Sequence, residues 1–115
     1  MDAAVADADK AVAFWSAALG APAEPDADRV YHRLDGAAPG IEIEVQAVDD
    51  VPRYHIDIET DDVAAETARL EALGATRVAE HNGWKVLRAP SGHLLCVVPV
   101  QSDQAFFTAN SKIAE

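Results

Sequence analysis

Cysteine is nearly absent from the sequence. Cys96 is the only one among 115 residues, so no disulfide can form within the chain, and a reducing, cytoplasmic compartment is the simplest expectation. Basic residues are also scarce, because 9 lysines and arginines stand against 20 acidic residues and leave a formal net charge of −11. A chain with this charge repels nucleic-acid phosphates and anionic lipids, so we expect neither nucleic acid nor a membrane as a partner.

Long hydrophobic runs are missing too. The apolar stretch "AVAFWSAALGAPA", which follows Lys10, is too short to span a bilayer. It has the length of a signal-peptide core, but a signal peptide needs a basic start, and Asp2, Asp7 and Asp9 precede this stretch. The sequence also shows no Ser/His/Asp arrangement, phosphate-binding glycine loop or paired-cysteine motif. Covalent catalysis therefore has no obvious nucleophile, and catalytic residues stay unassigned.

What the sequence does contain is typical of a folded domain. Half of the residues are hydrophobic (50%) and a quarter are charged (25%), which is the composition of an ordinary globular chain. A length of 115 residues supplies one domain with a single core. We expect residues 1–100 to form this domain and residues 101–115 to form a C-terminal tail.

The first half predicts one helix and one hairpin. The helix is expected over 7–19, with Asp7 as its cap and Gly20 as the left-handed residue that ends it. Helical spacing gives it an apolar side formed by Val12, Trp15 and Leu19, with Phe14 beside them. The hairpin is expected from strands at 29–34 and 41–48 around a turn at 35–40.

The second half predicts a strand, a helix and three further strands. Asp61 and Asp62 favour a helix start through the macrodipole, and Gly74 marks its end. The helix is expected over 61–73, with a buried stripe of Val63, Leu70 and Leu73. The strands are expected at 53–59, 76–78, 83–89 and 93–100.

The two halves share a pattern. Leu73-Gly74-Ala75 repeats Leu19-Gly20-Ala21 at an offset of 54 residues, and the final strands align at an offset of 52, which pairs Glu44 with Cys96. One alternative is that Leu-Gly-Ala is simply a common helix ending in an alanine-rich chain. Because the order of elements also agrees, the pattern favours one unit that is repeated.

Three stretches carry a family resemblance: "AVAFWSAALGA", "RYHIDIETDDVAAETARLEALGAT" and "GWKVLRAPSGHLLCVV". They resemble the glyoxalase/bleomycin-resistance/extradiol-dioxygenase superfamily, also called vicinal oxygen chelate, and most of all its small glyoxalase-like bacterial members. The likeness extends to about Pro99. It implies an α+β fold of two βαβββ modules, 1–50 with a truncated first strand and 53–100, whose curled mixed sheets surround a shared cavity. It also implies a homodimer as the common assembly and, in many members, a divalent metal.

The resemblance places metal ligands at the start of each module's first strand and in each module's last strand. His55 stands at the second-module position, but the first-module position falls at Met1 or ahead of it. In the last strands the positions map onto Glu44, with Glu42 as the alternative register, and onto Cys96. We therefore expect no complete metal site and no cofactor. His55, Glu44 and Cys96 remain a three-ligand alternative, against the usual role of such a cysteine as a small buried apolar group.

Strand alternation predicts which side chains face the cavity. His55, Asp57 and Glu59 share one face of their strand, and Glu42, Glu44 and Gln46 share one face of theirs. Ile41, Ile43, Val45, Ile56 and Ile58 are then expected to pack on the helices. Tyr31 and Trp84, on strands taken to be neighbours, would supply aromatic walls. The alternative is a sheet with one wet face, which is polar whether or not anything binds.

We therefore expect a protein that binds a small neutral or cationic molecule in an acidic and aromatic cavity. Its candidate ligand-binding residues are Tyr31, Glu42, Glu44, Gln46, His55, Asp57, Trp84 and Cys96. The alternative is a metal-dependent lyase or isomerase that uses His55 and Glu44. Phe106 and Phe107 are expected to dock the tail on the body or on a partner subunit, and the alternative is a flexible terminus. His32 can face either way, and His81 and His93 are expected in solvent.

Overall fold

The structure, a computed structural model, describes residues 1–113. It divides into a first unit, Met1–Tyr54, and a second unit that begins at His55. The first unit contains β1 (Asp2–Ala4), the short 3-10 helix η1 (Val5–Asp7), α1 (Ala8–Leu19), β2 (Ala23–Pro25), β3 (Tyr31–Leu34) and β4 (Glu44–Val48). The second contains β5 (Ile56–Thr60), α2 (Val63–Ala72), β6 (Thr76–His81), β7 (Trp84–Arg88), β8 (Leu94–Pro99) and α3 (Gln104–Asn110).

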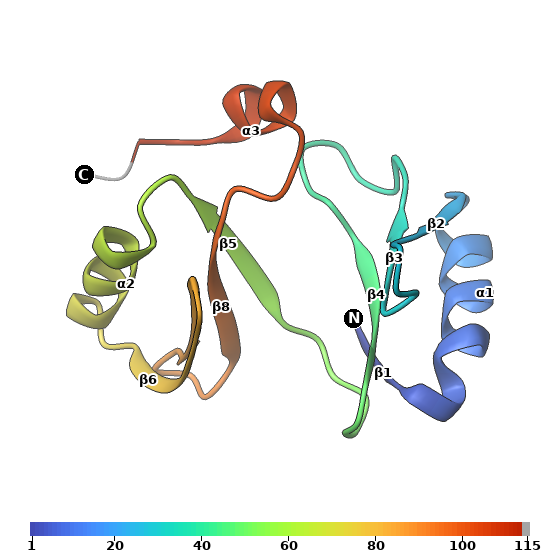
Figure 1. The fold of residues 1–115 in the computed structure, drawn as a ribbon, viewed down its shortest axis with the longest axis horizontal. Helices are drawn as coiled ribbons and strands as arrows, with labels where there is room; N and C mark the ends of the chain where they lie inside the picture. Colours follow the sequence, from blue (N-terminus) through green and yellow to red (C-terminus); the bar gives the residue numbers. More distant parts are fainter. Residues whose placement is uncertain (114–115) are drawn as a thin grey trace. The chain divides into compact units, whose positions relative to one another are not determined.

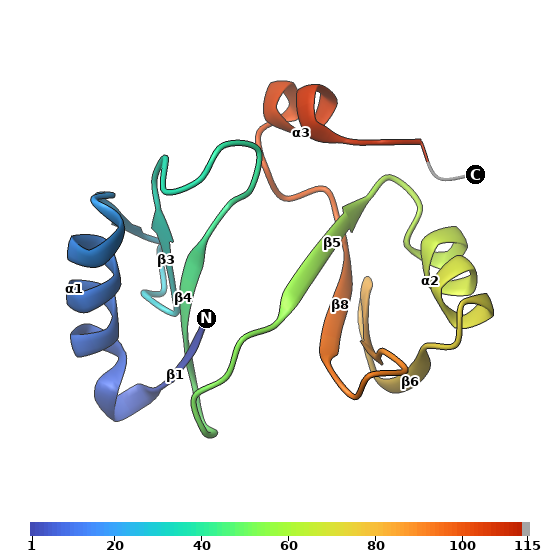
Figure 2. The same ribbon diagram turned by 180° about the vertical axis from the view of Figure 1, so that it is seen from behind.

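The two units have the same topology (Figures 1 and 2). The strand order is β1-β4-β3-β2 in the first sheet and β5-β8-β7-β6 in the second. In each sheet the first strand runs parallel to the last, while the remaining pairs are antiparallel. The predicted α+β fold of two βαβββ modules with mixed sheets is confirmed.

Helix α1 ends as its sequence predicts. Gly20 adopts the left-handed conformation (φ 63°, ψ 31°), which costs a glycine little because it has no Cβ. The backbone N–H of Ala21 then donates to the carbonyl of Ser16 at 3.0 Å. The predicted cap at the other end is wrong in its chemistry, because Asp7 occupies the N-cap position without a side-chain hydrogen bond.

Helix α1 covers the core of the first unit with only part of its predicted apolar side. Val12 and Trp15 pack against a buried cluster of Ala3, Ala21, Leu34 and Val45. Phe14 is 63% exposed and Leu19 is 39% exposed, so the expectation that they join this side is wrong. Ala11 packs on the core with Val12 and Trp15, and Phe14 instead meets the Trp15 ring in a T-shaped contact.

Helix α2 is capped by the second of its two aspartates. The Asp62 carboxylate accepts a hydrogen bond from the backbone N–H of Ala65 at 2.9 Å. The helix stops at Ala72, and Leu73 is 66% exposed, so the predicted buried stripe does not reach it. Thr67 is the fully buried residue of α2.

The strands differ from the predictions mainly at their ends. The strand expected at 41–48 begins at Glu44, which leaves Glu42 outside it, and Ile41 is 65% exposed. The strand expected at 29–34 begins at Tyr31, because Arg29 has a positive φ of 58°. One strand had no individual prediction: β2 is three residues long and carries too little alternation to be recognised. The equally short β1 is the truncated first strand that the resemblance implied.

The remaining apolar positions vary in burial. Ile56 is 67% exposed, contrary to the expectation that it packs on a helix, whereas Ile58 is half-buried and Val45 fully buried. Among the described residues, no helix is long and apolar enough to cross a membrane.

Candidate functional site

Each sheet has a face that turns away from its helix. In the first sheet, His32, Leu34 and Val45 are buried, and Leu34 and Val45 belong to the cluster on which α1 packs. The strand register places Tyr31 beside Gln46 and Arg33 beside Glu44. Because neighbours in register share a face, these four residues form one surface, which we call the first polar face.

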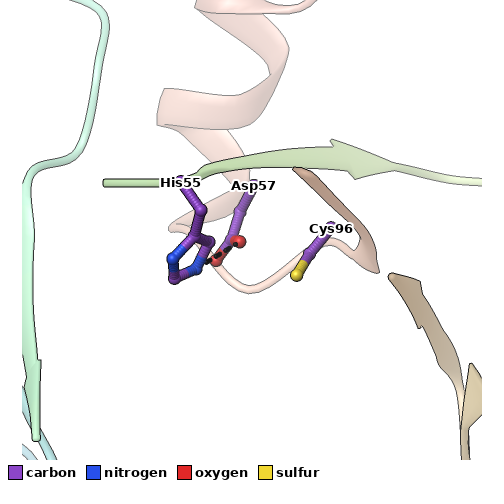
Figure 3. Close-up of side chains that lie close together, drawn as sticks. All are labelled: His55, Asp57 and Cys96. Carbon is purple, nitrogen blue, oxygen red and sulfur yellow. Dashed lines mark ion pairs between the residues drawn. The ribbon is translucent and has the colours of Figure 1, made fainter. Parts of the chain in front are cut away.

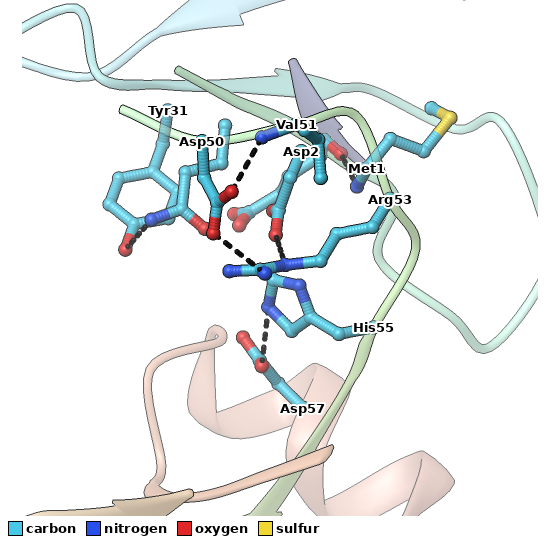
Figure 4. A network of polar contacts seen from close by, with 10 residues as sticks. Met1, Asp2, Tyr31, Asp50, Val51, Arg53, His55 and Asp57 are labelled. Atoms are coloured by element: carbon cyan, nitrogen blue, oxygen red, sulfur yellow. Dashed lines mark hydrogen bonds and ion pairs between the residues drawn. The ribbon is translucent and has the colours of Figure 1, made fainter. Parts of the chain in front are cut away.

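The first polar face combines an aromatic ring with hydrogen-bonding groups. The Gln46 side-chain amide donates to the Tyr31 hydroxyl at 3.0 Å (Figure 4). Tyr31 is 39% exposed, while Glu44 and Gln46 are half-buried. The ring thus has a hydrogen-bonded edge and an accessible surface.

Arg33 places a positive charge among these groups. Its guanidinium donates to the Glu24 carboxylate, and that hydrogen bond, together with the charges of Glu24, Glu42 and Asp35, raises its pKa. Sequence reasoning missed this residue, although the same alternation that selects Tyr31 also selects Arg33. The first polar face is therefore less acidic than predicted.

Glu42 lies at the margin of this surface. It precedes β4 and is exposed, so strand geometry does not direct its side chain as the prediction assumed. Its charge still acts on Arg33. Of the two alternative registers for a ligand position in this strand, Glu44 is the one that lies in β4.

The second sheet presents the candidate residues of the other unit. The register aligns Asp57, Cys96 and Val86 in one row across β5, β8 and β7. Trp84 lies two residues before Val86 and so faces the same side. Ile58, Leu87 and Val97 occupy the opposite face, where Leu87 and Val97 are fully buried. We call the side with Asp57, Cys96 and Trp84 the second polar face.

His55 joins this face from just ahead of β5. Its Nε2 lies 3.2 Å from Oδ1 of Asp57, with the histidine side chain 18% and the aspartate side chain 38% exposed. Figure 3 shows Cys96 on the other side of Asp57, with all three side chains extending from the same side of the strands. One donor atom from each of His55, Asp57 and Cys96 lies within 4.8 Å of the other two.

Trp84 has an aromatic partner that was not predicted. His81 ends β6 and pairs with Trp84 across the hairpin, where the two rings stack with centroids 4.0 Å apart and planes 14° from parallel. The prediction that His81 is exposed to solvent is confirmed, but the prediction that it lies in a loop is wrong, because it belongs to β6. The Asn82-Gly83 pair could have revealed this, because it is a strong signal for a two-residue hairpin turn.

Tyr31 and Trp84 do not lie on neighbouring strands, as the sequence interpretation assumed. Tyr31 belongs to β3 of the first sheet and Trp84 to β7 of the second. Each unit therefore has its own aromatic residue beside its own polar groups.

Glu59 has a structural partner. Its carboxylate accepts hydrogen bonds from the backbone N–H of Ser102 at 2.9 Å and from the Ser102 hydroxyl at 2.5 Å. Asp103 then caps α3 by accepting from the N–H of Phe106. The predicted role of Glu59 as a cavity carboxylate is thus replaced by anchoring of the tail, in which Phe106 and Phe107 are half-buried.

Sequence reasoning also missed a charged network at the β1 edge of the first sheet. The Asp2 side chain is 3% exposed, and one of its carboxylate oxygens lies 3.2 Å from Nε of Arg53. Arg53 also donates to Asp50 at 2.9 Å (Figure 4). The hydrogen bond that the Asp50 carboxylate accepts from the backbone N–H of Val51, followed by the charge of Arg53, lowers the pKa of Asp50. This network holds residues 50–53 against β1.

Three side chains of the second polar face have donor atoms close enough together to hold a metal ion. His55, Asp57 and Cys96 offer imidazole, carboxylate and thiol donors, a set that suits zinc. Gln46 of β4 and Val98 of β8 occupy equivalent positions, because the final strands align at an offset of 52 residues. Asp2 pairs with Gln46 and Glu59 pairs with Val98, so Asp2 corresponds to Glu59. The second unit therefore supplies a donor set that fits an ion, and it includes Asp57, which was not among the predicted metal ligands.

This topology and these polar faces define an α+β protein built from two βαβββ modules. The chain belongs to the glyoxalase-like domain family, whose model matches residues 1–98. The resemblance to the vicinal oxygen chelate superfamily is thereby confirmed.

Solved structures with a similar fold include enzymes and a binding protein. Trypanothione-dependent glyoxalase I of Leishmania major is 16% identical, with 86% of this chain and 83% of that chain covered and a TM-score of 0.38. The antibiotic-binding protein TnmS3 of Streptomyces sp. CB03234 is 20% identical, with 86% and 91% covered and a TM-score of 0.36. A gene product of Arabidopsis thaliana is 18% identical, with 84% and 92% covered and a TM-score of 0.36. No curated protein matches the chain. Similarities this low carry no information about activity.

Proposed function

We propose that the protein binds a small neutral or cationic aromatic molecule on its polar faces. The observation that carries this proposal is that each unit places half-buried polar groups and an aromatic ring together on the sheet face away from its helix. A sheet face that is merely wet needs no ring beside its polar groups. Small-molecule sites, in contrast, combine apolar walls with a few polar groups that fix orientation.

Charge selects the class of ligand. Glu44 and Asp57 are negative, and Arg33 is already paired with Glu24. The chain as a whole carries −11, so an anionic ligand is repelled over a long range. A cation over the Tyr31 or Trp84 ring gains about 0.5–1 kcal/mol at an exposed site, too little for binding alone. The carboxylates must therefore supply most of the selectivity.

A thermal-shift screen tests the proposal. We expect basic or neutral aromatic compounds to raise the melting temperature and carboxylates or phosphate esters to leave it unchanged. Glu44→Gln should weaken the shift, since loss of one charge contact of about 1.4 kcal/mol reduces affinity tenfold. Glu80→Gln is the control, because Glu80 is exposed in β6 and paired with Arg77. Stabilisation by anions alone, or equal loss in both variants, would contradict the proposal.

A second candidate function is a metal-dependent lyase or isomerase in which His55 would help to hold the ion. The gathering of His55 with Asp57 and Cys96 favours it, because such donors suit a divalent ion. A bound ion supplies Lewis acidity toward a substrate with neighbouring oxygens. Freshly purified protein that contains stoichiometric zinc, nickel, manganese or iron would favour this function over metal-free binding.

A further inference from the structure

Three side chains of different chemistry converge on the second polar face. The parallel pairing of β5 with β8 sets Asp57 beside Cys96, and His55 lies two residues before Asp57 on the same side. Their donor atoms all lie within 4.8 Å of one another. The adjacent pairs Ile56 with Leu95 and Ile58 with Val97 continue the ladder on both sides, so backbone hydrogen bonds hold the positions of Asp57 and Cys96.

The spacing of these donors resembles one edge of a tetrahedral site. Zinc–ligand distances of 2.0–2.3 Å place neighbouring ligand atoms about 3.3–3.6 Å apart. His55 Nε2 and Asp57 Oδ1 are already 3.2 Å apart. The thiol must approach by no more than about 1.5 Å, which is within reach of a side-chain rotation.

We propose that His55, Asp57 and Cys96 form a mononuclear site for a thiophilic divalent ion of the zinc class, contained entirely within the second unit. This set differs from the ligands that the family resemblance implies, because Asp57 takes part and Glu44 is not required. The site does not depend on the proposed binding of an aromatic molecule. Three protein ligands leave a fourth position open to water or a ligand.

The chemistry of the donors selects the ion. Thiolate and carboxylate together carry two negative charges, which neutralise a divalent cation. A thiolate and an imidazole favour zinc and its neighbours over magnesium or calcium, which prefer oxygen ligands alone. Cys96 must lose its proton, so binding releases a proton and weakens as the pH falls.

Cobalt(II) is the probe that tests the site. Metal-free protein titrated with Co²⁺ should bind one ion per chain, with the visible bands of tetrahedral cobalt and a near-ultraviolet thiolate-to-cobalt band. Zinc should displace the cobalt and remove both signals. Because Cys96 is the only cysteine in the chain, a thiolate band identifies it without ambiguity. Failure to bind one ion per chain, or bands without thiolate character, would overturn the proposal.

Variants assign the remaining ligands. Cys96→Ser should abolish the thiolate band, and Asp57→Asn and His55→Gln should each weaken cobalt binding at least tenfold. His93→Gln is the control histidine, because His93 bonds Ser91 in an exposed turn. Glu44→Gln should change affinity less than twofold. Unchanged binding in Asp57→Asn, or its loss in Glu44→Gln, would overturn this ligand set.

Two further measurements separate the possible failures. Far-ultraviolet circular dichroism checks that each variant is folded. If Cys96→Ser does not fold, Asp57→Asn decides the test, because the partly exposed Asp57 side chain can be replaced without disturbing the core. Thermal shifts with aromatic compounds are measured on the metal-free protein. A loss of those shifts therefore contradicts the proposed function alone, and a loss of cobalt binding contradicts the metal site alone.

Discussion

At the residue scale, the structure reveals polar groups in places that alternation cannot distinguish. His32 alternates with exposed residues of β3 and proves to be 6% exposed. Thr67 stands among alanines and glutamate in α2 and is 1% exposed. Neither burial follows from residue type, because histidine and threonine are found on both sides of helices and strands.

Thr67 provides a prediction about stability. Its Oγ1 is buried and has no hydrogen-bond partner among the described residues, and an unsatisfied buried hydroxyl costs about 1 kcal/mol or more. Valine has the same shape without the hydroxyl. Thr67→Val should therefore raise the free energy of unfolding by about 0.5–1 kcal/mol in urea denaturation.

The control for this variant is Thr76→Val, at an exposed position of β6. It should change the free energy of unfolding by less than about 0.5 kcal/mol. If Thr67→Val instead destabilises the protein, the hydroxyl has a partner that compensates for its burial.

At the element scale, the two modules repeat the same helix ending in different surroundings. Gly20 and Gly74 both follow a leucine and both have positive φ angles, 63° and 104°. A Cβ on Gly20 would meet no heavy atom within 4 Å, whereas one on Gly74 would lie 3.1 Å from Cγ of Pro90. The shared sequence predicts both helix ends, but the contact with Pro90 exists only in the folded second unit.

This difference predicts unequal effects of alanine. Gly20→Ala should cost about 1–2 kcal/mol, because alanine is strained in the left-handed region. Gly74→Ala carries the backbone strain plus the close contact with the Pro90 ring, so it should cost at least about 1 kcal/mol more. Urea denaturation of both variants measures the difference, and equal losses would mean that the proline moves aside freely.

At the scale of the whole molecule, exposed apolar residues suggest a further contact surface. Val51 is 64% exposed and Tyr54 is 71% exposed, and both lie in the segment that follows β4 in the first unit. Apolar residues clustered in this way often mark a protein–protein interface. We propose that a second copy of the chain covers them in a homodimer.

Light scattering tests the homodimer. At micromolar concentration the mass should be twice the 12.2 kDa of one chain, and Tyr54→Glu should shift it toward the monomer, because a buried unpaired charge is costly. Ala18→Glu, on the exposed side of α1, serves as the control. A monomeric parent protein would contradict the proposal directly.

The order of elements was predictable because it depends on local chemistry. Helix ends follow from Gly20 and Gly74 in the left-handed conformation, and the strands of the second unit follow from alternation that persists over several residues. The same periodicity placed Glu44, Gln46 and Asp57 on polar faces. The short edge strand β2 escaped prediction, because the three residues Ala23–Pro25 have no period to detect.

The partners of each side chain could not be predicted, because they depend on which strands become neighbours. The sequence by itself determined a repeated helix with the longer strands around it, and the set of side chains that alternation directs to one face of each strand; the two βαβββ modules followed from the family resemblance. Only the tertiary structure decided that Cys96 lies beside Asp57, that His81 stacks on Trp84 and that Glu59 holds Ser102. Sequence periodicity records the direction of a side chain relative to its own backbone, whereas register and tail docking arise from contacts between residues far apart in the chain.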